Sequence, residues 1–216
     1  ANYIACSHCH PAGQHDRQTW DFSDRGEGLR NTTSLLGSGQ TGMLHWSGNF
    51  DEFQDFEFDI RQHFGGHGLM EDSVIENATP LGDPLSGESE ELDALAEWLS
   101  DLEPPMSLVV NPLALETFND AGCQECHHGP MYTDSSTLTP IRHDIGTIGE
   151  HSGSRLAGEL DGLDTPSLIG LRHSAPYLHD GSARTIEAAI LAHDLISVQS
   201  LSSAQLELLV ELMESL

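Results

Sequence analysis

The chain has 216 residues, enough for one large domain or two small ones. Its formal net charge is −27 and all eight basic residues are arginine, which argues against binding to nucleic acids or to an anionic membrane. No apolar run approaches the roughly 18 residues of a transmembrane helix. With 38% hydrophobic residues and 13 histidines, the composition suggests that something other than side chains fills part of the interior.

The first recognisable element is the motif Cys6-Ser7-His8-Cys9-His10. C-x-x-C-H is the attachment signature of c-type haem: the two thiols add to the vinyl groups of one porphyrin, and the histidine binds the iron. A cytochrome c domain normally packs a helix before this motif, and here only five residues precede Cys6. We therefore expect that an upstream part of the natural polypeptide, or a partner chain, supplies that helix.

Four helices are predicted after the glycine-rich first third of the chain. The stretch Ser86–Leu102 has leucines at steps of three and four residues, and Ser89 or Ser86 can cap its start. The prolines at 104 and 105 end it, and Met106–Pro112 forms a linker. The other three helices are expected at Leu113–Ala121, Thr185–His193 and Ser202–Ser215.

A second motif, Cys123-Gln124-Glu125-Cys126-His127, follows the second of these helices. A zinc site could use two C-x-x-C pairs, and a redox dithiol could use one, but neither needs a histidine directly after each pair. The two motifs therefore predict two covalently bound haem c groups. Because c-type haem is attached outside the cytoplasm, they also predict a periplasmic or extracellular protein.

The order of these elements predicts a repeated plan of haem motif, turn-rich middle and C-terminal helix. We expect a mainly α fold with two tandem class I cytochrome c-like domains, residues 1–104 and 105–216. Each domain would wrap one haem with long irregular loops, and the first would lack its N-terminal helix.

The segment Asp164–His193 (DTPSLIGLRHSAPYLHDGSARTIEAAILAH) resembles the second domain of the di-haem cytochrome c peroxidase superfamily. Gly122–Pro130 is similar to the start of that domain, and Arg30–Thr32 and His45–Gly48 to elements of the first domain. The chain is most similar to the cytochrome part of larger members that carry a β-propeller. The resemblance implies that Trp46 lies between the haems, and that Asn31 and the backbone of Ser174 and Pro176 bind calcium.

The same resemblance locates the ligands opposite the motif histidines. In the family, a methionine or another ligand lies fourteen residues after the histidine of the HDG motif, and here this position is His193. His179, the histidine of that motif, is expected to support the haem environment by hydrogen bonding. For the first haem, the family's loop histidine is missing from Trp20–Arg30. His45 is the first candidate there, and the alternatives are His63, His67 and Met70.

The ligand on the second face of each iron distinguishes between two possible functions. Histidine on both faces of each iron favours electron transfer with a redox partner, such as a basic cytochrome drawn to the acidic surface. An open face would favour a hydrogen-peroxide reductase, in which an unligated His45 with Glu71 or Asp72 could act as the acid–base group. A filament-forming cytochrome has no feature in its favour. Three arginines are expected to pair with haem propionates: Arg30, Arg142 and Arg172.

Overall fold

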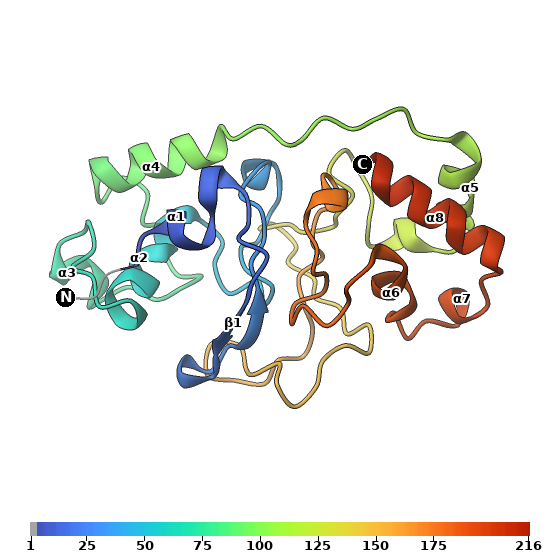
Figure 1. Cartoon of the computed structure of the whole chain (residues 1–216). Coiled ribbons are helices and arrows are strands. Elements are labelled where there is room, and N and C mark those ends of the chain that lie inside the picture. The colour runs from blue at the N-terminus through green and yellow to red at the C-terminus, as the bar shows by residue number, and fades with distance from the viewer. Residues whose placement is uncertain (1–3) are drawn as a thin grey trace.

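Short helices separated by long irregular loops make up most of the computed structural model, which describes residues 4–216 (Figure 1). None of the helices in this range combines the length and the apolar character that crossing a membrane requires. The mainly helical fold expected from the sequence is confirmed. The helices are α1 (Cys6–Cys9), α2 (Phe56–Phe58), α3 (Asp72–Ile75), α4 (Glu90–Ser100), α5 (Pro112–Asp120), α6 (Ile186–Leu191), α7 (Ile196–Gln199) and α8 (Ser203–Ser215).

The four predicted helices are α4, α5, α6 and α8, and local caps explain where each begins. The side chain of Ser89, and not that of Ser86, accepts a hydrogen bond from the backbone N–H of Leu92, so α4 starts at residue 90. Asn111 caps α5 directly before Pro112. Thr185 caps α6 and Ser202 caps α8, so these two helices are slightly shorter than their expected ranges.

A small antiparallel sheet, which the sequence analysis did not predict, joins the two halves of the chain. Strand β1 (Thr19–Phe22) pairs with β2 (Gly28–Asn31), with Trp20 opposite Arg30. The other edge of β2 bonds to loops of the second half, because the N–H of Leu29 donates to the carbonyl of His151. Gly28 has φ +73°, and a Cβ there would lie 2.4 Å from that same carbonyl oxygen, so this close approach requires glycine.

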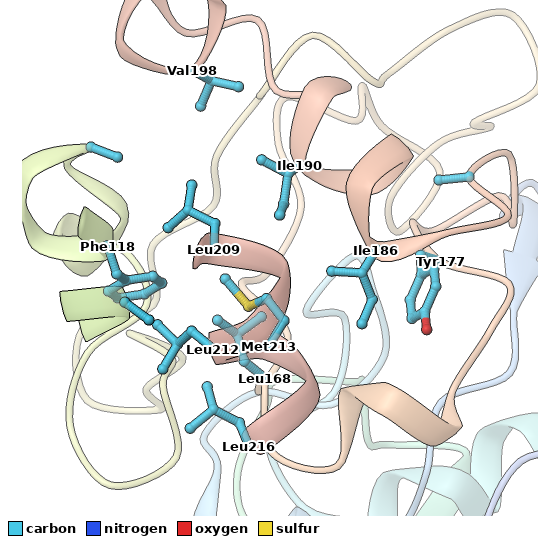
Figure 2. Packing of buried hydrophobic residues seen from close by; sticks show 13 residues of the cluster. Phe118, Leu168, Tyr177, Ile186, Ile190, Val198, Leu209, Leu212, Met213 and Leu216 are labelled. Atoms are coloured by element: carbon cyan, nitrogen blue, oxygen red, sulfur yellow. The ribbon is translucent and has the colours of Figure 1, made fainter. Parts of the chain in front are cut away.

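The hydrophobic side chains form two clusters. The larger one packs α5 and α6 against α8 around Phe118, Leu209 and Leu212, as Figure 2 shows. The smaller one gathers Phe50 and Leu92 with their neighbours in the first half. Each cluster lies within one of the two expected domains, and an extended segment between α4 and α5 connects the halves (Figure 1). The domain boundary at residues 104 and 105 stays a prediction.

Asp55, next to the smaller cluster, has a buried carboxyl group whose ionisation works against folding. Burial, together with the nearby charges of Asp51 and Glu52, raises the pKa of Asp55 to about 7. The folded state therefore holds a proton that the unfolded state loses near pH 4. The stability that this proton provides is complete below the unfolded pKa and is lost as the pH rises through 7.

We therefore expect Asp55→Asn to raise the free energy of unfolding at pH 8 by roughly 2–4 kcal/mol, and to leave it unchanged at pH 4. Urea denaturation at the two pH values measures this difference. Asp83→Asn is the matched control, because it removes the same charge from the strongly acidic chain at an exposed position. Equal destabilisation by Asp55→Asn at both pH values would contradict the prediction.

Candidate functional site

A cavity of about 530 Å³ lies between the two halves and is lined by residues of both. Segments around the first motif, β2 and α2 contribute from the first half. The second motif, the loop around residue 165, α6 and α8 contribute from the second half. Residues that the sequence analysis singled out gather here: His10, Asn31, His45, Trp46, Cys123, Cys126, His127, Ser174, Pro176, His179 and His193.

The two motif histidines have the same local arrangement. The ring Nδ1 of His10 lies 3.1 Å from the carbonyl oxygen of Gln14, and that of His127 lies 3.0 Å from the carbonyl oxygen of Tyr132. A carbonyl only accepts, so each Nδ1 carries the proton and each Nε2 is free to bind a metal. Burial lowers the pKa of His10, and it lowers that of His127 to about 4, so both rings are neutral at physiological pH.

His193 and His45 line the same cavity with an equivalent arrangement. Nδ1 of His193, just after α6, lies 2.9 Å from the carbonyl oxygen of Ala189. Nδ1 of His45 lies 2.8 Å from Oδ1 of Asn49. Burial is the main cause of the lowered pKa of both motif histidines. His193 also lowers the pKa of His127, and His45 also lowers that of His10. The fold thus brings His45 near His10, and both His193 and His143 near His127.

His45 occupies a restrained position. Its backbone has φ +63°, which is uncommon for a residue other than glycine. Its ring packs against Phe50 and Phe56 at centroid distances of 4.7 and 4.8 Å. The alternative candidates lie elsewhere: His63 and His67 are exposed, and Met70 is buried in the smaller hydrophobic cluster. Among the described residues that line the cavity, His45 is the one that belongs to this set of candidates.

Trp46 and Asn31 connect the two halves of the cavity wall. Nε1 of Trp46 donates to the carbonyl oxygen of Asn31, at 2.8 Å. The side-chain amide of Asn31 donates to the carbonyl oxygen of Pro176, at 2.6 Å, and its buried Oδ1 has no partner. Two of the oxygens expected to bind calcium therefore lie together. Calcium binding itself stays a prediction.

The three arginines expected to contact propionates differ in position. Arg30 is buried and its Nε has no hydrogen-bond partner. Arg142 forms a two-pronged ion pair with the exposed Asp161, at 3.0 and 3.1 Å. Arg172 is engaged at the surface, where its Nε lies 2.9 Å from the ring of His173. None of the three lines the cavity, and Arg30 is the one among them that is buried in the interior.

Several buried polar atoms around the cavity have no protein partner. Nδ1 of His15, Nδ1 of His179 and Oδ1 of Asp164 are in this position, together with Oδ1 of Asn31. Buried polar groups are nearly always paired, so such a concentration fits a bound group with polar substituents. A haem fits, because its porphyrin ring covers the apolar wall and a propionate accepts from a ring N–H such as that at Nδ1 of His179. The cavity is thus suited to the cofactor that the two motifs predict.

Two residues of this set have roles that the sequence analysis did not predict. Burial raises the pKa of Asp164 to about 7, so its carboxyl group is partly protonated at neutral pH. Its backbone N–H donates to the carbonyl oxygen of Trp46, at 2.9 Å. His15 is held by a 2.7 Å contact from Nε2 to the carbonyl oxygen of His173. No local pattern marks either residue, since both contacts join distant parts of the chain.

The zinc alternative finds little support in the arrangement of possible ligands. Among the described residues, Cys126, Asp134 and His143 are the one group of three or more His, Cys, Asp or Glu side chains close enough to share an ion. His143 bonds to Asp134 through Nε2, at 2.7 Å, and its Nδ1 lies 3.8 Å from the sulfur of Cys126. This group contains neither Cys123 nor a cysteine of the first motif, so it does not join the two pairs.

Comparisons with known proteins agree with this arrangement. No family model matches the sequence. The methylamine utilization protein MauG of Methylophilus methylotrophus is 23% identical over 236 residues, which cover 91% of this chain and 68% of the relative. A chain of Kuenenia stuttgartiensis hydrazine synthase, from a structure under xenon pressure, matches with a TM-score of 0.66 and 22% identity over 99% of this chain and 81% of its own. A MauG-like protein associated with microbial copper homeostasis matches with a TM-score of 0.68 and 17% identity over 99% and 82%.

The mainly helical fold, the two C-x-x-C-H motifs and a cavity lined by both motif histidines are typical of a cytochrome c-like class of protein. The relative and the shared fold support the resemblance of this chain to the di-haem cytochrome c peroxidase-like superfamily.

Proposed function

We propose that this chain is an extracytoplasmic di-haem c-type cytochrome that passes electrons between two bis-histidine haems and a redox partner. The observation that carries the proposal is the pairing of imidazoles on one cavity: His10 with His45, and His127 with His193. All four rings have Nδ1 next to an oxygen acceptor, which leaves four Nε2 atoms for metal binding. When bound, the two haems supply reversible one-electron chemistry.

The residues of the chain have distinct tasks in this proposal. The four cysteines, Cys6, Cys9, Cys123 and Cys126, form the thioether bonds. Trp46 lines the cavity and is the expected route for electrons between the two haems. Arg30 and His179 offer buried donors to propionates, and Asn31, Ser174 and Pro176 offer oxygens to calcium. Apolar side chains exclude water, which keeps the reorganisation around each iron small.

The proposed partner is a basic redox protein, such as a small cytochrome. The charge of −27 grows more negative when the propionates of two haems are added, and it attracts a positively charged carrier over the Debye length. Attachment of c-type haem outside the cytoplasm supports a periplasmic or extracellular location.

A hydrogen-peroxide reductase is the second candidate. The expected acid–base residues give it no support, because Glu71 and Asp72 are exposed and lie outside the cavity. Asp164 does support it: this buried carboxyl group lines the cavity with a pKa of about 7, which suits general acid–base catalysis. This function also needs one iron with an open face.

Electron paramagnetic resonance and optical spectra of the oxidised, haem-loaded protein distinguish the two functions. We expect two low-spin signals typical of bis-histidine iron, no cyanide complex within minutes, and no measurable peroxide turnover. A high-spin signal, with rapid cyanide binding and reduction of hydrogen peroxide, would overturn electron transfer as the primary function and support the reductase.

A further inference from the structure

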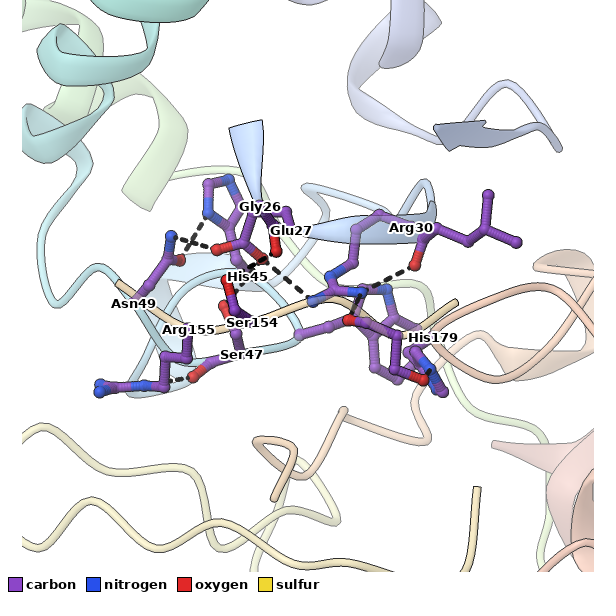
Figure 3. A network of polar contacts seen from close by, with 12 residues as sticks. Gly26, Glu27, Arg30, His45, Ser47, Asn49, Ser154, Arg155 and His179 are labelled. Atoms are coloured by element: carbon purple, nitrogen blue, oxygen red, sulfur yellow. Dashed lines mark hydrogen bonds and ion pairs between the residues drawn. The ribbon is translucent and has the colours of Figure 1, made fainter. Parts of the chain in front are cut away.

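A largely buried carboxylate, Glu27, connects polar groups from both halves of the chain (Figure 3). Its side chain is 17% exposed. Oε1 accepts from the side-chain amide of Asn49, at 3.2 Å. Oε2 accepts from the hydroxyl of Ser47, at 3.2 Å, and from the guanidinium of Arg30, at 3.1 Å. An ionised carboxylate only accepts, so it fixes the direction of every hydrogen bond that reaches it.

Toward the first half, Glu27 determines the tautomer of His45. Because the Nδ2 of Asn49 must donate to the carboxylate, the Oδ1 of Asn49 is the atom that faces His45, at 2.8 Å from Nδ1. This oxygen can only accept, so Nδ1 of His45 carries the proton. Nε2 of His45 is then an unprotonated lone pair, which is the form that binds a metal.

Toward the second half, the same carboxylate holds Arg30 against the loop that contains Ser152. The other terminal nitrogen of Arg30 donates to the backbone oxygen of Ser152, at 2.8 Å. The Ser152 hydroxyl accepts from the N–H of Gly149, at 2.9 Å, and lies 2.8 Å from Nε2 of His179. Nε2 of His179 is thus bonded to this hydroxyl, and its buried Nδ1 has no protein partner.

We propose that Glu27 is a positioning residue that fixes His45, through Asn49, with Nδ1 protonated and Nε2 free for the iron, and that, through Arg30, holds the loop whose Ser152 hydroxyl contacts His179. The inference rests on the proposed haem ligation by His45. One charge thus sets the tautomer of His45 and anchors the loop that contacts His179 in the other half of the chain. Partners of this kind orient metal-bound imidazoles, and their loss typically weakens binding about 10–100-fold.

Glu27→Gln tests the proposal, because glutamine keeps the shape but brings an N–H group to donors that need an acceptor. In the oxidised, haem-loaded protein we expect cyanide to bind the haem of the first motif about 10-fold faster than in the wild type, since a loosened His45 leaves the iron more often. Asp24→Asn is the matched control: it removes an exposed charge three residues away and should change the rate less than twofold. Equal rates for Glu27→Gln and Asp24→Asn would overturn the proposal.

A second variant shows whether a faster cyanide reaction comes from the lost hydrogen bonds or from misfolding. A second measurement separates the role of Glu27 from the ligation by His45. Asn49→Ala interrupts the path to His45 but leaves the pair of Glu27 with Arg30, and it should accelerate cyanide binding to the same extent. Ring ¹⁵N NMR of His45 in the reduced protein, with carbon monoxide added where an iron is five-coordinate, reads the tautomer directly. A high-spin wild-type spectrum would overturn the ligation by His45. An Nε2-protonated His45 in the wild type would overturn the role of Glu27.

Discussion

Cys123→Ala/Cys126→Ala is expected to carry one covalently bound haem instead of two. The two thiols of a C-x-x-C-H motif are the attachment points, and the resulting thioethers survive denaturation. His127 remains in the variant, but a histidine alone holds haem only reversibly. Denatured mass spectrometry measures the effect as the loss of one haem mass, and the pyridine haemochrome spectrum measures it as half the absorbance per chain.

The loss should also destabilise the second half of the molecule more than the first. Cys123 packs against the larger hydrophobic cluster, and the cavity beside it is lined by Phe118, Ile190 and Leu209. In the variant, no porphyrin covers this apolar wall. We therefore expect the α5–α8 region to exchange amide hydrogens faster than in the wild type. Gln124→Ala, at a variable position of the same motif, is the control and should retain both haems. A colourless wild type, or two haems on the double variant, would contradict the assignment.

The parts of the fold that the sequence predicts are those fixed by neighbouring residues. The leucine spacing in α4 and α8 and the capping side chains of Ser89 and Ser202 act within one or two turns, so helix positions follow from local patterns. The C-x-x-C-H motifs are equally local. The sheet of β1 and β2 is different, because each strand has four residues and β2 is held by backbone bonds to a loop more than a hundred residues away.

The candidate site shows the same division. The sequence predicts His45 and His193 by their positions relative to recognisable motifs, and the structure brings both to the cavity. It does not predict Glu27, Asn49 or Asp164, whose importance comes from hydrogen bonds and burial created by the folded chain. The surface ion pair of Arg142 with Asp161 also depends on the folded chain, because an irregular loop brings the two residues together. Local patterns thus point to candidate ligands, whereas the groups that support these residues are found only in the folded structure.

His193→Ala is expected to convert the haem of the second motif from low spin to high spin. Removal of the imidazole leaves an apolar space bounded by α6, and the residues described around it offer few replacement ligands. We expect a new high-spin signal in the electron paramagnetic resonance spectrum of the oxidised protein, and cyanide binding at least about 10-fold faster than in the wild type. His63→Ala is the control, because this exposed histidine lies outside the cavity and its loss should leave both spectra unchanged.

His193→Met separates a ligand from a merely structural histidine. Methionine can bind iron through its thioether, so this variant should remain low spin while its reduction potential rises, because His/Met ligation favours the reduced state. A structural role would instead give the same spectrum and potential for the wild type and both variants. If His193→Ala also reduces hydrogen peroxide, the main difference between this chain and a peroxide reductase is that His193 occupies one coordination position of the iron. In that case the buried carboxyl group of Asp164 is the nearest acid–base group to examine, and the pH dependence of turnover should then show an apparent pKa close to 7.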